Sequence, residues 1–276
     1  MLAAMILGGA ACTRPICEGG AMHMRALVTG ASAGLGAEFA RQLAADGLSL
    51  VLVARDAARL EALAAALPLH AGAAAEVLPA DLTDPADLER VAARLADATH
   101  PIDVLVNNAG FAVAEPFHAS AIDDERRMHE LLSWVPLRLG HAALPGMRER
   151  GCGGILNVAS LAGRLPSGSY AAAKSQVITL SRALHARYRG DGITVTALLP
   201  GFVPTEFHDR MGVSPDVVPR AGWADASTVV REGLRALRRR RGIVVSDWRY
   251  RLAAPIIPLV PDRLIAGVGL GRRIER

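Results

Sequence analysis

The segment Arg25-Ala-Leu-Val-Thr-Gly-Ala-Ser-Ala-Gly-Leu-Gly36 decides the fold. Its first five residues are typical of a short buried strand, and the apolar spacing that continues through Phe39 and Leu43 predicts a helix. A glycine-rich turn between a strand and a helix is the first unit of a dinucleotide-binding fold. The glycines let the backbone approach a pyrophosphate, and the helix N-terminus supplies N–H groups for it. An ordinary turn that happens to be rich in glycine is the alternative.

A second indication of function is the position of the chain's single lysine. The chain has 31 basic residues, and Lys174 is the only lysine among them. It stands four residues after Tyr170, so a helix would place both side chains on one face. A cation beside a phenol lowers the phenol pKa from its usual value of about 10, which suits a general acid or base. Because this spacing is common, a partly exposed tyrosine beside a solvated lysine is the alternative.

Three further motifs each follow or end a predicted buried strand. The strands are expected at 102–106, 154–160 and 194–199, and the motifs are Asn107-Asn-Ala-Gly110, Ser160 and Pro200-Gly201-x-x-x-Thr205. Along the chain they join Thr29-Gly30-x-x-x-Gly34-x-Gly36 and Tyr170-x-x-x-Lys174. Taken together and in this order, the five motifs closely resemble those of the short-chain dehydrogenase/reductase family.

The resemblance implies that Ser160, Tyr170 and Lys174 are catalytic. Tyr170 would give a proton to a carbonyl during reduction or take one from a hydroxyl during oxidation. Lys174 would hold the nicotinamide ribose and keep the pKa of Tyr170 low, and Ser160 would hydrogen-bond the reacting oxygen.

The resemblance also implies a set of cofactor-binding residues spread over the whole domain. In this set Asp81 would contact the adenine edge, although it could equally be a cap or turn residue. Thr205, with the Pro200-Gly201 turn and the backbone of Val203, would seat the carboxamide, although a loop hydroxyl or helix cap is the alternative for Thr205. The complete set is Gly30, Ser32, Gly34, Leu35, Gly36, Arg55, Asp81, Leu82, Asn108, Ala109, Gly110, Tyr170, Lys174, Pro200, Gly201, Val203 and Thr205.

The choice between the two nicotinamide cofactors rests on Arg55. This residue stands just after the strand predicted at 48–53, where relatives that use NAD carry an aspartate. An arginine at this place accommodates the 2′-phosphate of NADP. Ala33 occupies the position at which NADP-using relatives usually have a second cation. The sequence favours NADP(H), with NAD(H) or a merely solvated Arg55 as the alternative.

The chain is expected to form one α/β domain, a doubly wound Rossmann fold. Strands and helices alternate without a linker, and the resemblance implies a seven-stranded parallel sheet of order 3-2-1-4-5-6-7. Besides those above, we expect strands at 25–29, 48–53, 75–79 and 242–246, and helices at 56–67, 120–150, 170–188 and 226–238, with a further helix starting at Asp84-Pro85. The predicted divisions are a disordered extension at 1–24, the oxidoreductase domain at 25–246 and a basic and apolar tail at 247–276.

The two ends of the chain lie outside the family pattern. Residues 1–24 lack the basic start of a signal peptide, so a cytoplasmic protein whose working start is Met22 or Met24 is expected. Three cysteines give neither a disulfide framework nor metal-ligand spacing. From Arg238 onward the chain is strongly basic, and the apolar run 252–260 is too short and too interrupted by proline to span a bilayer.

Two functions are open for this tail. It could rest on an anionic membrane surface as a peripheral contact. We favour a tail that packs over the substrate cleft or an interface between subunits of a homo-oligomer. Nucleic-acid binding is not expected, because no aromatic platform or reader motif accompanies the arginines.

Two features depart from the family pattern. The segment between Ser160 and Tyr170 is compact, and Leu132 stands where the family has an asparagine that steadies a water of the proton relay. The neighbouring Ser133 is expected to point about 100° away on a helix. Leu132 favours an alternative function, a non-catalytic relative that binds cofactor as a sensor or partner subunit. A nucleotide-sugar epimerase or dehydratase ranks last, since its glycine spacing and longer substrate domain are missing.

The leading hypothesis is an NADP(H)-dependent alcohol dehydrogenase or ketone reductase acting on a small molecule. The residues expected around the cleft are mostly apolar, which favours a hydrophobic alcohol or ketone: Leu161, Leu165, Phe202, Phe207, Met211 and Trp223. Packing beneath the loop is the alternative for these side chains.

Overall fold

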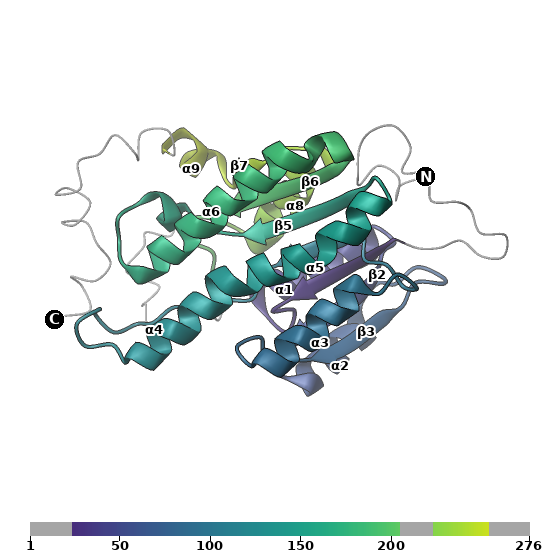
Figure 1. Cartoon of the computed structure of the whole chain (residues 1–276), viewed down its shortest axis with the longest axis horizontal. Coiled ribbons are helices and arrows are strands. Elements are labelled where there is room, and N and C mark those ends of the chain that lie inside the picture. Colours follow the sequence, from purple (N-terminus) through teal and green to yellow (C-terminus); the bar gives the residue numbers. More distant parts are fainter. Residues whose placement is uncertain (1–23, 205–222, 254–276) are drawn as a thin grey trace.

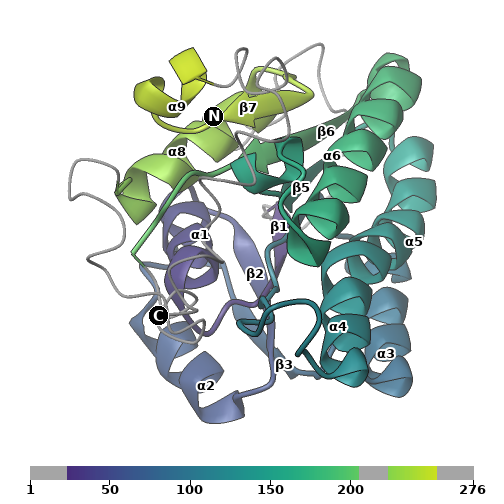
Figure 2. The same ribbon diagram turned by 90° about the vertical axis from the view of Figure 1, so that its left-hand side faces the viewer.

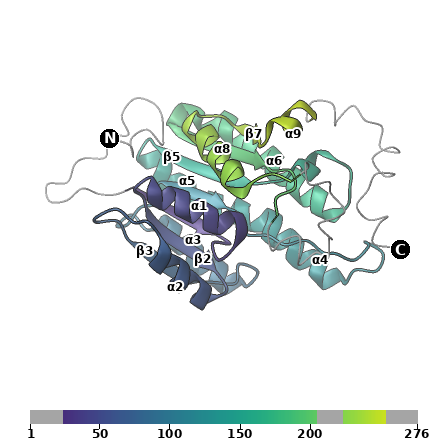
Figure 3. The same ribbon diagram turned by 180° about the vertical axis from the view of Figure 1, so that it is seen from behind.

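The protein is a doubly wound α/β domain. The structure, a computed structural model, describes residues 24–204 and 223–253. Its central sheet has seven parallel strands in the order β3-β2-β1-β4-β5-β6-β7, as predicted. The helices α1, α2 and α8 cover one face of the sheet, α3, α5 and α6 cover the other, and α4 extends past the end of the sheet (Figures 1, 2 and 3).

The strands form where the sequence has short runs of apolar residues, because a parallel sheet is covered on both faces. Most predicted boundaries agree with the observed ones within two residues. Ser160 was predicted to end a strand, but β5 ends at Val158. Ser160 lies beyond the strand as the N-cap of a short 3₁₀ turn, η3 (Leu161–Arg164). The strands are β1 (Arg25–Thr29), β2 (Ser49–Ala54), β3 (Ala75–Pro79), β4 (Val104–Asn107), β5 (Gly153–Val158), β6 (Ile193–Leu199) and β7 (Ile243–Val245).

Local signals set the helix ends. Asp84 caps α3 by accepting hydrogen bonds from the backbone N–H groups of Ala86 and Asp87, with proline in the first turn, as predicted. The tail was not expected to contain a helix, but α9 forms there. The helices are α1 (Gly34–Ala45), α2 (Ala57–Ala66), α3 (Pro85–Ala96), α4 (Ile122–His129), α5 (Val135–Glu149), α6 (Ser169–Tyr188), α8 (Ala226–Arg238) and α9 (Trp248–Ala253).

The long helix predicted at 120–150 is interrupted. A π-helical turn, η2 (Glu130–Trp134), separates α4 from α5. Pro136 is the second residue of α5, and because proline has no N–H it cannot donate to the carbonyl of Leu132 four residues earlier. A helix that loses this bond is expected to widen locally, which accounts for the π turn at this position.

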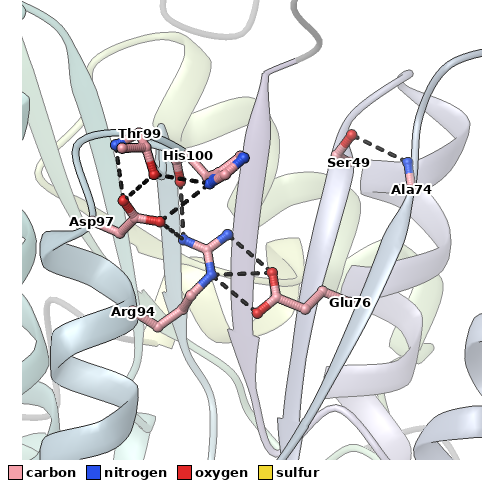
Figure 4. A network of polar contacts seen from close by, with 7 residues as sticks. All are labelled: Ser49, Ala74, Glu76, Arg94, Asp97, Thr99 and His100. Carbon is pink, nitrogen blue, oxygen red and sulfur yellow. Dashed lines mark hydrogen bonds and ion pairs between the residues drawn. The ribbon is translucent and has the colours of Figure 1, made fainter.

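A polar network ties the edge strand β3 to α3 (Figure 4). The Arg94 guanidinium donates two parallel hydrogen bonds to the Glu76 carboxylate, each 3.0 Å long, and a third of 2.9 Å to the carbonyl of His100. Nearby, hydrogen bonds from Thr99 lower the pKa of Asp97 to about 2. The network joins the start of β3 to the end of α3 and serves the edge of the sheet, whereas the predicted site residues follow the C-terminal ends of the strands.

Two features are absent from the part of the chain that the structure describes. Within 24–204 and 223–253, no helix is long and apolar enough to cross a membrane. The same residues contain no group of three or more His, Cys, Asp or Glu side chains that could hold a metal ion. Cys152, buried just before β5, is disulfide-bonded. The other two cysteines lie outside the described residues.

Candidate active site

In the glycine-rich turn, the backbone at Gly36 lies directly against the backbone at Gly30. Gly30 and Gly34 have φ angles of +64° and +54°, which favour glycine. A Cβ on Gly36 would lie 2.0 Å from the carbonyl oxygen of Gly30. The N-cap of α1, Ala33, offers no side-chain acceptor to the first turn of the helix. The turn therefore provides a close backbone approach and a helix N-terminus without a side-chain cap.

The Asn107-Asn-Ala-Gly110 segment is hydrogen-bonded to this turn. The Asn108 side chain donates to the carbonyls of Thr29 and Gly30 over 3.0 and 3.2 Å. The hydroxyl of Thr29 accepts from the backbone N–H groups of Asn108 and Ala109 over 3.0 and 3.1 Å. The structure thus joins two motifs that are far apart in the sequence. The sequence did not predict that the buried Thr29 hydroxyl would hold them together.

The three predicted catalytic residues come together at the start of α6. A hydrogen bond joins the side chains of Ser160 and Tyr170. The Nζ atom of Lys174 lies 5.8 Å from the centroid of the Tyr170 ring and donates a 2.7 Å hydrogen bond to the carbonyl of Val158. The compact segment between Ser160 and Tyr170 fits because a Cβ on Gly163 would be 2.8 Å from the backbone of Lys174, so only glycine lets η3 pack this closely on α6.

Burial dominates the titration of this site. Burial raises the pKa of Tyr170 to about 12, although the hydrogen bond with Ser160 acts in the opposite direction. Burial lowers the pKa of Lys174 to about 8. The predicted lowering of the Tyr170 pKa by Lys174 is therefore wrong for this structure. The physical reason is that the ammonium group is directed at the Val158 carbonyl while the phenolate form is disfavoured by desolvation.

Apolar side chains surround the Tyr170 ring. The cluster consists of Met128, Leu132 and Ala173 with partly buried Phe111, Ala112, Val113 and Tyr170. Leu132 is 1% exposed, and one of its methyl carbons is 2.8 Å from where a Cβ on Gly110 would be. Ser133 is also 1% exposed, and it donates a 3.4 Å hydrogen bond to the Ala173 carbonyl of α6. The wide π turn directs both residues towards α6.

Charged residues gather near the end of β3. Asp81 accepts hydrogen bonds of 3.0 and 2.7 Å from the backbone and hydroxyl of Thr83. Burial raises the pKa of Asp81, but these hydrogen bonds and the charges of Arg55 and Arg127 outweigh it, so the pKa is lowered overall. Asp81 is thus a turn residue that also faces two cations. Arg127, from α4, was not anticipated because it is distant in sequence.

The remaining predicted residues occupy the other parts of the same edge. Ser32 and Leu35 are partly exposed on the glycine-rich turn, and Leu82 is buried beside Asp81. Pro200 follows β6, Gly201 packs against the ring of Tyr250, and Val203 is buried. Thr205, Phe207 and Met211 lie outside the described residues.

A cavity of about 760 Å³ lies on another side of α6. Leu165, Ala172, Thr179 and Arg182 contribute to its lining. On a helix, the α6 residues among these are rotated by roughly 100–180° from Tyr170 and Lys174. The cavity is therefore not the cleft in which a molecule would reach Tyr170, although Leu165 was expected to line that cleft.

Comparison with known proteins agrees with the fold. The sequence profile of the short chain dehydrogenase family matches residues 24–213. This protein therefore belongs to the short-chain dehydrogenase family. Galactitol 2-dehydrogenase (L-tagatose-forming) of Cereibacter sphaeroides is 36% identical over 220 residues, which cover 75% of this chain and 82% of that protein.

Solved structures give the same result. A short-chain dehydrogenase from Sphingobium yanoikuyae in complex with NADPH has a TM-score of 0.76 and 38% identity, over 80% of this chain and 87% of that one. The bulky-bulky ketone specific alcohol dehydrogenase from Comamonas testosteroni has a TM-score of 0.73 and 30% identity, over 84% of this chain and 91% of that one.

Proposed function

We propose that this member of the family is an NADP(H)-dependent oxidoreductase that interconverts an alcohol and a ketone, with Tyr170 as the acid/base. One observation carries the proposal: Ser160 hydrogen-bonds Tyr170, and Lys174 lies on the same face of α6 as Tyr170. A hydroxyl, a phenol and an ammonium group gathered in a largely apolar setting suit proton exchange with a substrate oxygen.

The residues present fit a dinucleotide. The turn at Gly30 and Gly36 has no room for a Cβ, and the N-terminus of α1 has no side-chain cap, as backbone contact with a pyrophosphate requires. Arg55 is exposed just after β2, where it would meet a 2′-phosphate, and the NADPH-bound relative supports this choice. Lys174 and the Pro200-Gly201 turn would hold the nicotinamide half. When bound, NADP(H) supplies or accepts the hydride.

Tyr170, Ser160 and Lys174 have different roles in the proposed reaction. With its pKa at about 12, Tyr170 is protonated at neutral pH and can donate its proton to a carbonyl oxygen. Ser160 would donate a hydrogen bond to the same oxygen and stabilise the negative charge that develops on it. Lys174, with a pKa of about 8, is mainly cationic at neutral pH and would hold the nicotinamide ribose.

We further propose that the substrate is a hydrophobic alcohol or ketone. The support is the apolar cluster around Tyr170, together with the aromatic pair Phe202 and Trp223 at the ends of the next loop. The Comamonas testosteroni relative is described as specific for bulky-bulky ketones, whereas the Cereibacter sphaeroides relative is described as acting on galactitol. A panel that contains bulky ketones and galactitol, read by the absorbance change of NADPH or NADP, tests both classes.

Replacement of Tyr170 tests the assignment directly. Tyr170→Phe removes the acid/base hydroxyl while keeping the ring, so turnover should fall by about 10² or more, with folding and NADPH binding almost unchanged. Tyr188→Phe, at the far end of α6, is the matched control and should keep full turnover. If Tyr170→Phe retains more than half of the wild-type turnover, the acid/base assignment is wrong.

The second candidate is a relative that binds cofactor without turnover. The observation that favours it is Leu132, which fills the place of the family's relay asparagine with an apolar side chain. The same panel separates the two candidates, because this one predicts tight NADPH binding with no absorbance change for any substrate.

A further inference from the structure

The loop that follows β6 is closed at its base. Phe202, just after the Pro200-Gly201 turn, and Trp223, just before α8, form a parallel β-bridge. Their rings pack edge to face with centroids 5.9 Å apart. The backbone N–H of Ala224 donates a 2.8 Å hydrogen bond to the carbonyl of Phe202. The two ends of this loop therefore hold each other at the edge of the sheet where Tyr170 also lies.

The C-terminal helix α9 contacts the first of these ends. The ring of Tyr250 lies against Gly201 so closely that a Cβ on Gly201 would be 2.1 Å from Tyr250 Cε2. Any other residue at this position would displace the ring or the turn. The backbone N–H of Phe202 also donates a 3.4 Å hydrogen bond to the Tyr250 hydroxyl. Tyr250 thus occupies the outer side of the turn that is proposed to seat the nicotinamide.

The neighbouring residue on α9 contacts the second end. The Arg249 guanidinium donates a 3.2 Å hydrogen bond to the carbonyl of Trp223. The same guanidinium is paired with Asp247, and its Nε–Oδ1 distance is 2.9 Å. The backbone N–H of Asp247 in turn donates to Glu232 of α8 over 2.9 Å. The contacts with Asp247 therefore hold the Arg249 guanidinium in place while it also donates to the carbonyl of Trp223.

We propose that α9 is a latch on this loop, in which Tyr250 holds the first end and Arg249 holds the second. On the proposed function, which this inference deepens, both are positioning residues for the nicotinamide and the substrate. A displacement of about 1 Å in such a turn can reduce the rate by about 10². Figure 1 shows α9 directly beyond β7, with only a short connection between them. That connection, together with the Glu232 contacts, fixes the helix to the body of the domain.

The opposite face of α9 supplies matched controls. Trp248 and Leu252 are 67% and 68% exposed, so shortening them leaves both latch contacts in place. The test variants are Tyr250→Ala and Arg249→Met, and the controls are Trp248→Ala and Leu252→Ala. Tyr250→Phe is the conservative variant, because it keeps the ring on Gly201 and loses only the acceptor for Phe202.

The first measurement needs no substrate. Hydrogen exchange of the Phe202 and Ala224 amides, followed by mass spectrometry, reports opening of the loop base. We expect exchange to be at least about tenfold faster in Tyr250→Ala and Arg249→Met, less accelerated in Tyr250→Phe, and unchanged in the controls. Equal exchange in latch variants and controls would overturn the proposal. This result stands even if the wild-type protein turns over no substrate, in which case only the proposed function fails.

The second measurement separates positioning from general loss of structure. In Tyr250→Ala and Arg249→Met, kcat/KM for the ketone should fall by about tenfold or more. The Kd for NADPH should change much less, because the adenosine half is bound at the glycine-rich turn and Arg55. Tyr250→Phe should recover most of the lost kcat/KM. A parallel loss of NADPH affinity without recovery in Tyr250→Phe would show a structural role only and would overturn the positioning role.

Discussion

Lys174 has an unusual place for the only lysine of the chain, since it is 6% exposed and its ammonium group donates to a backbone carbonyl. Burial lowers its pKa from 10.5 to about 8. In the window between these values the folded protein has lost this proton while the unfolded chain still binds it. Stability should therefore rise with pH across this window through this group.

We expect the difference in unfolding free energy between wild type and Lys174→Met to change by ~3 kcal/mol across that window, in favour of the wild type as pH rises. Denaturant unfolding at several pH values measures this difference. Because Tyr170 is present in both proteins, its own titration cancels to first order. A difference that stays constant with pH would show that Lys174 has an ordinary pKa in the folded state.

Arg55 controls the choice of cofactor in the proposed function. Arg55→Asp would place a carboxylate against the 2′-phosphate, so the NADPH Kd should rise by at least about tenfold more than the NADH Kd. Arg127→Ala tests whether the second cation near Asp81 acts on the same phosphate. Arg59→Ala, on an exposed turn of α2, is the control. An unchanged ratio of the two affinities in Arg55→Asp would make Arg55 a surface residue.

Leu132 raises the question of how the proton reaches solvent. Leu132→Asn restores the family's amide, and turnover should rise if the relay lacks only this group. The new amide would enter an apolar cluster, so the unfolding free energy should fall by on the order of 1–3 kcal/mol. Leu132→Met, which keeps the site apolar, is the control. A folded Leu132→Asn protein with unchanged or lower turnover would mean that the proton takes another path.

At the scale of elements, α6 is joined to the sheet by a buried polar chain. Asn107 of β4 donates to Asn157 of β5 over 2.8 Å, Asn157 donates to Ser181 of α6 over 2.9 Å, and Ser181 donates to the carbonyl of Val177 over 2.7 Å. All three polar side chains are buried. This chain fixes the helix that bears Tyr170 and Lys174 against β4 and β5, which lead to the Asn107-Asn-Ala-Gly110 segment and to Ser160.

Local patterns predicted the strands and helices well where the signal itself is local. The buried runs of β1, β2 and β6 and the cap at Asp84 are examples, since apolar spacing and capping chemistry act within a few residues. The π turn at Glu130–Trp134 was not predicted, because it depends on the hydrogen bond that Pro136 removes from the preceding turn and not on apolar spacing.

The parts of the site that the sequence did not predict depend on contacts between distant segments. The pKa of Tyr170 follows from burial, which no spacing reveals. The approach of Arg127 to Asp81 and of Tyr250 to Gly201 each requires the completed fold. The resemblance to the family supplied the proposed catalytic residues, whereas the electrostatics and the proposed latch required coordinates.

For the whole molecule, the structure separates the two parts of the membrane anchor that is the alternative function of the tail. Arg238 to Arg241 lie before β7 and α9 lies after it, so the basic cluster and the start of the apolar stretch are at opposite ends of that strand. Arg238 is paired with Asp46, and Arg249 and Arg251 are paired with Asp247 and Glu232. The arginines of α9 are thus engaged with the domain. This arrangement favours a tail that packs on its own domain or on a second subunit.

Truncation after Ser246 distinguishes the two functions of the tail. We expect the full-length protein not to bind anionic vesicles at low salt, and the truncated protein to lose stability or change its oligomeric state, because Tyr250 and Arg249 are removed from the loop base. Vesicle flotation, thermal unfolding and light scattering on both proteins measure these outcomes. A surface anchor would instead give binding that weakens as salt shortens the Debye length from about 30 Å at 0.01 M to about 8 Å at 0.15 M. Salt-sensitive flotation of the full-length protein alone would show that the tail is a membrane contact.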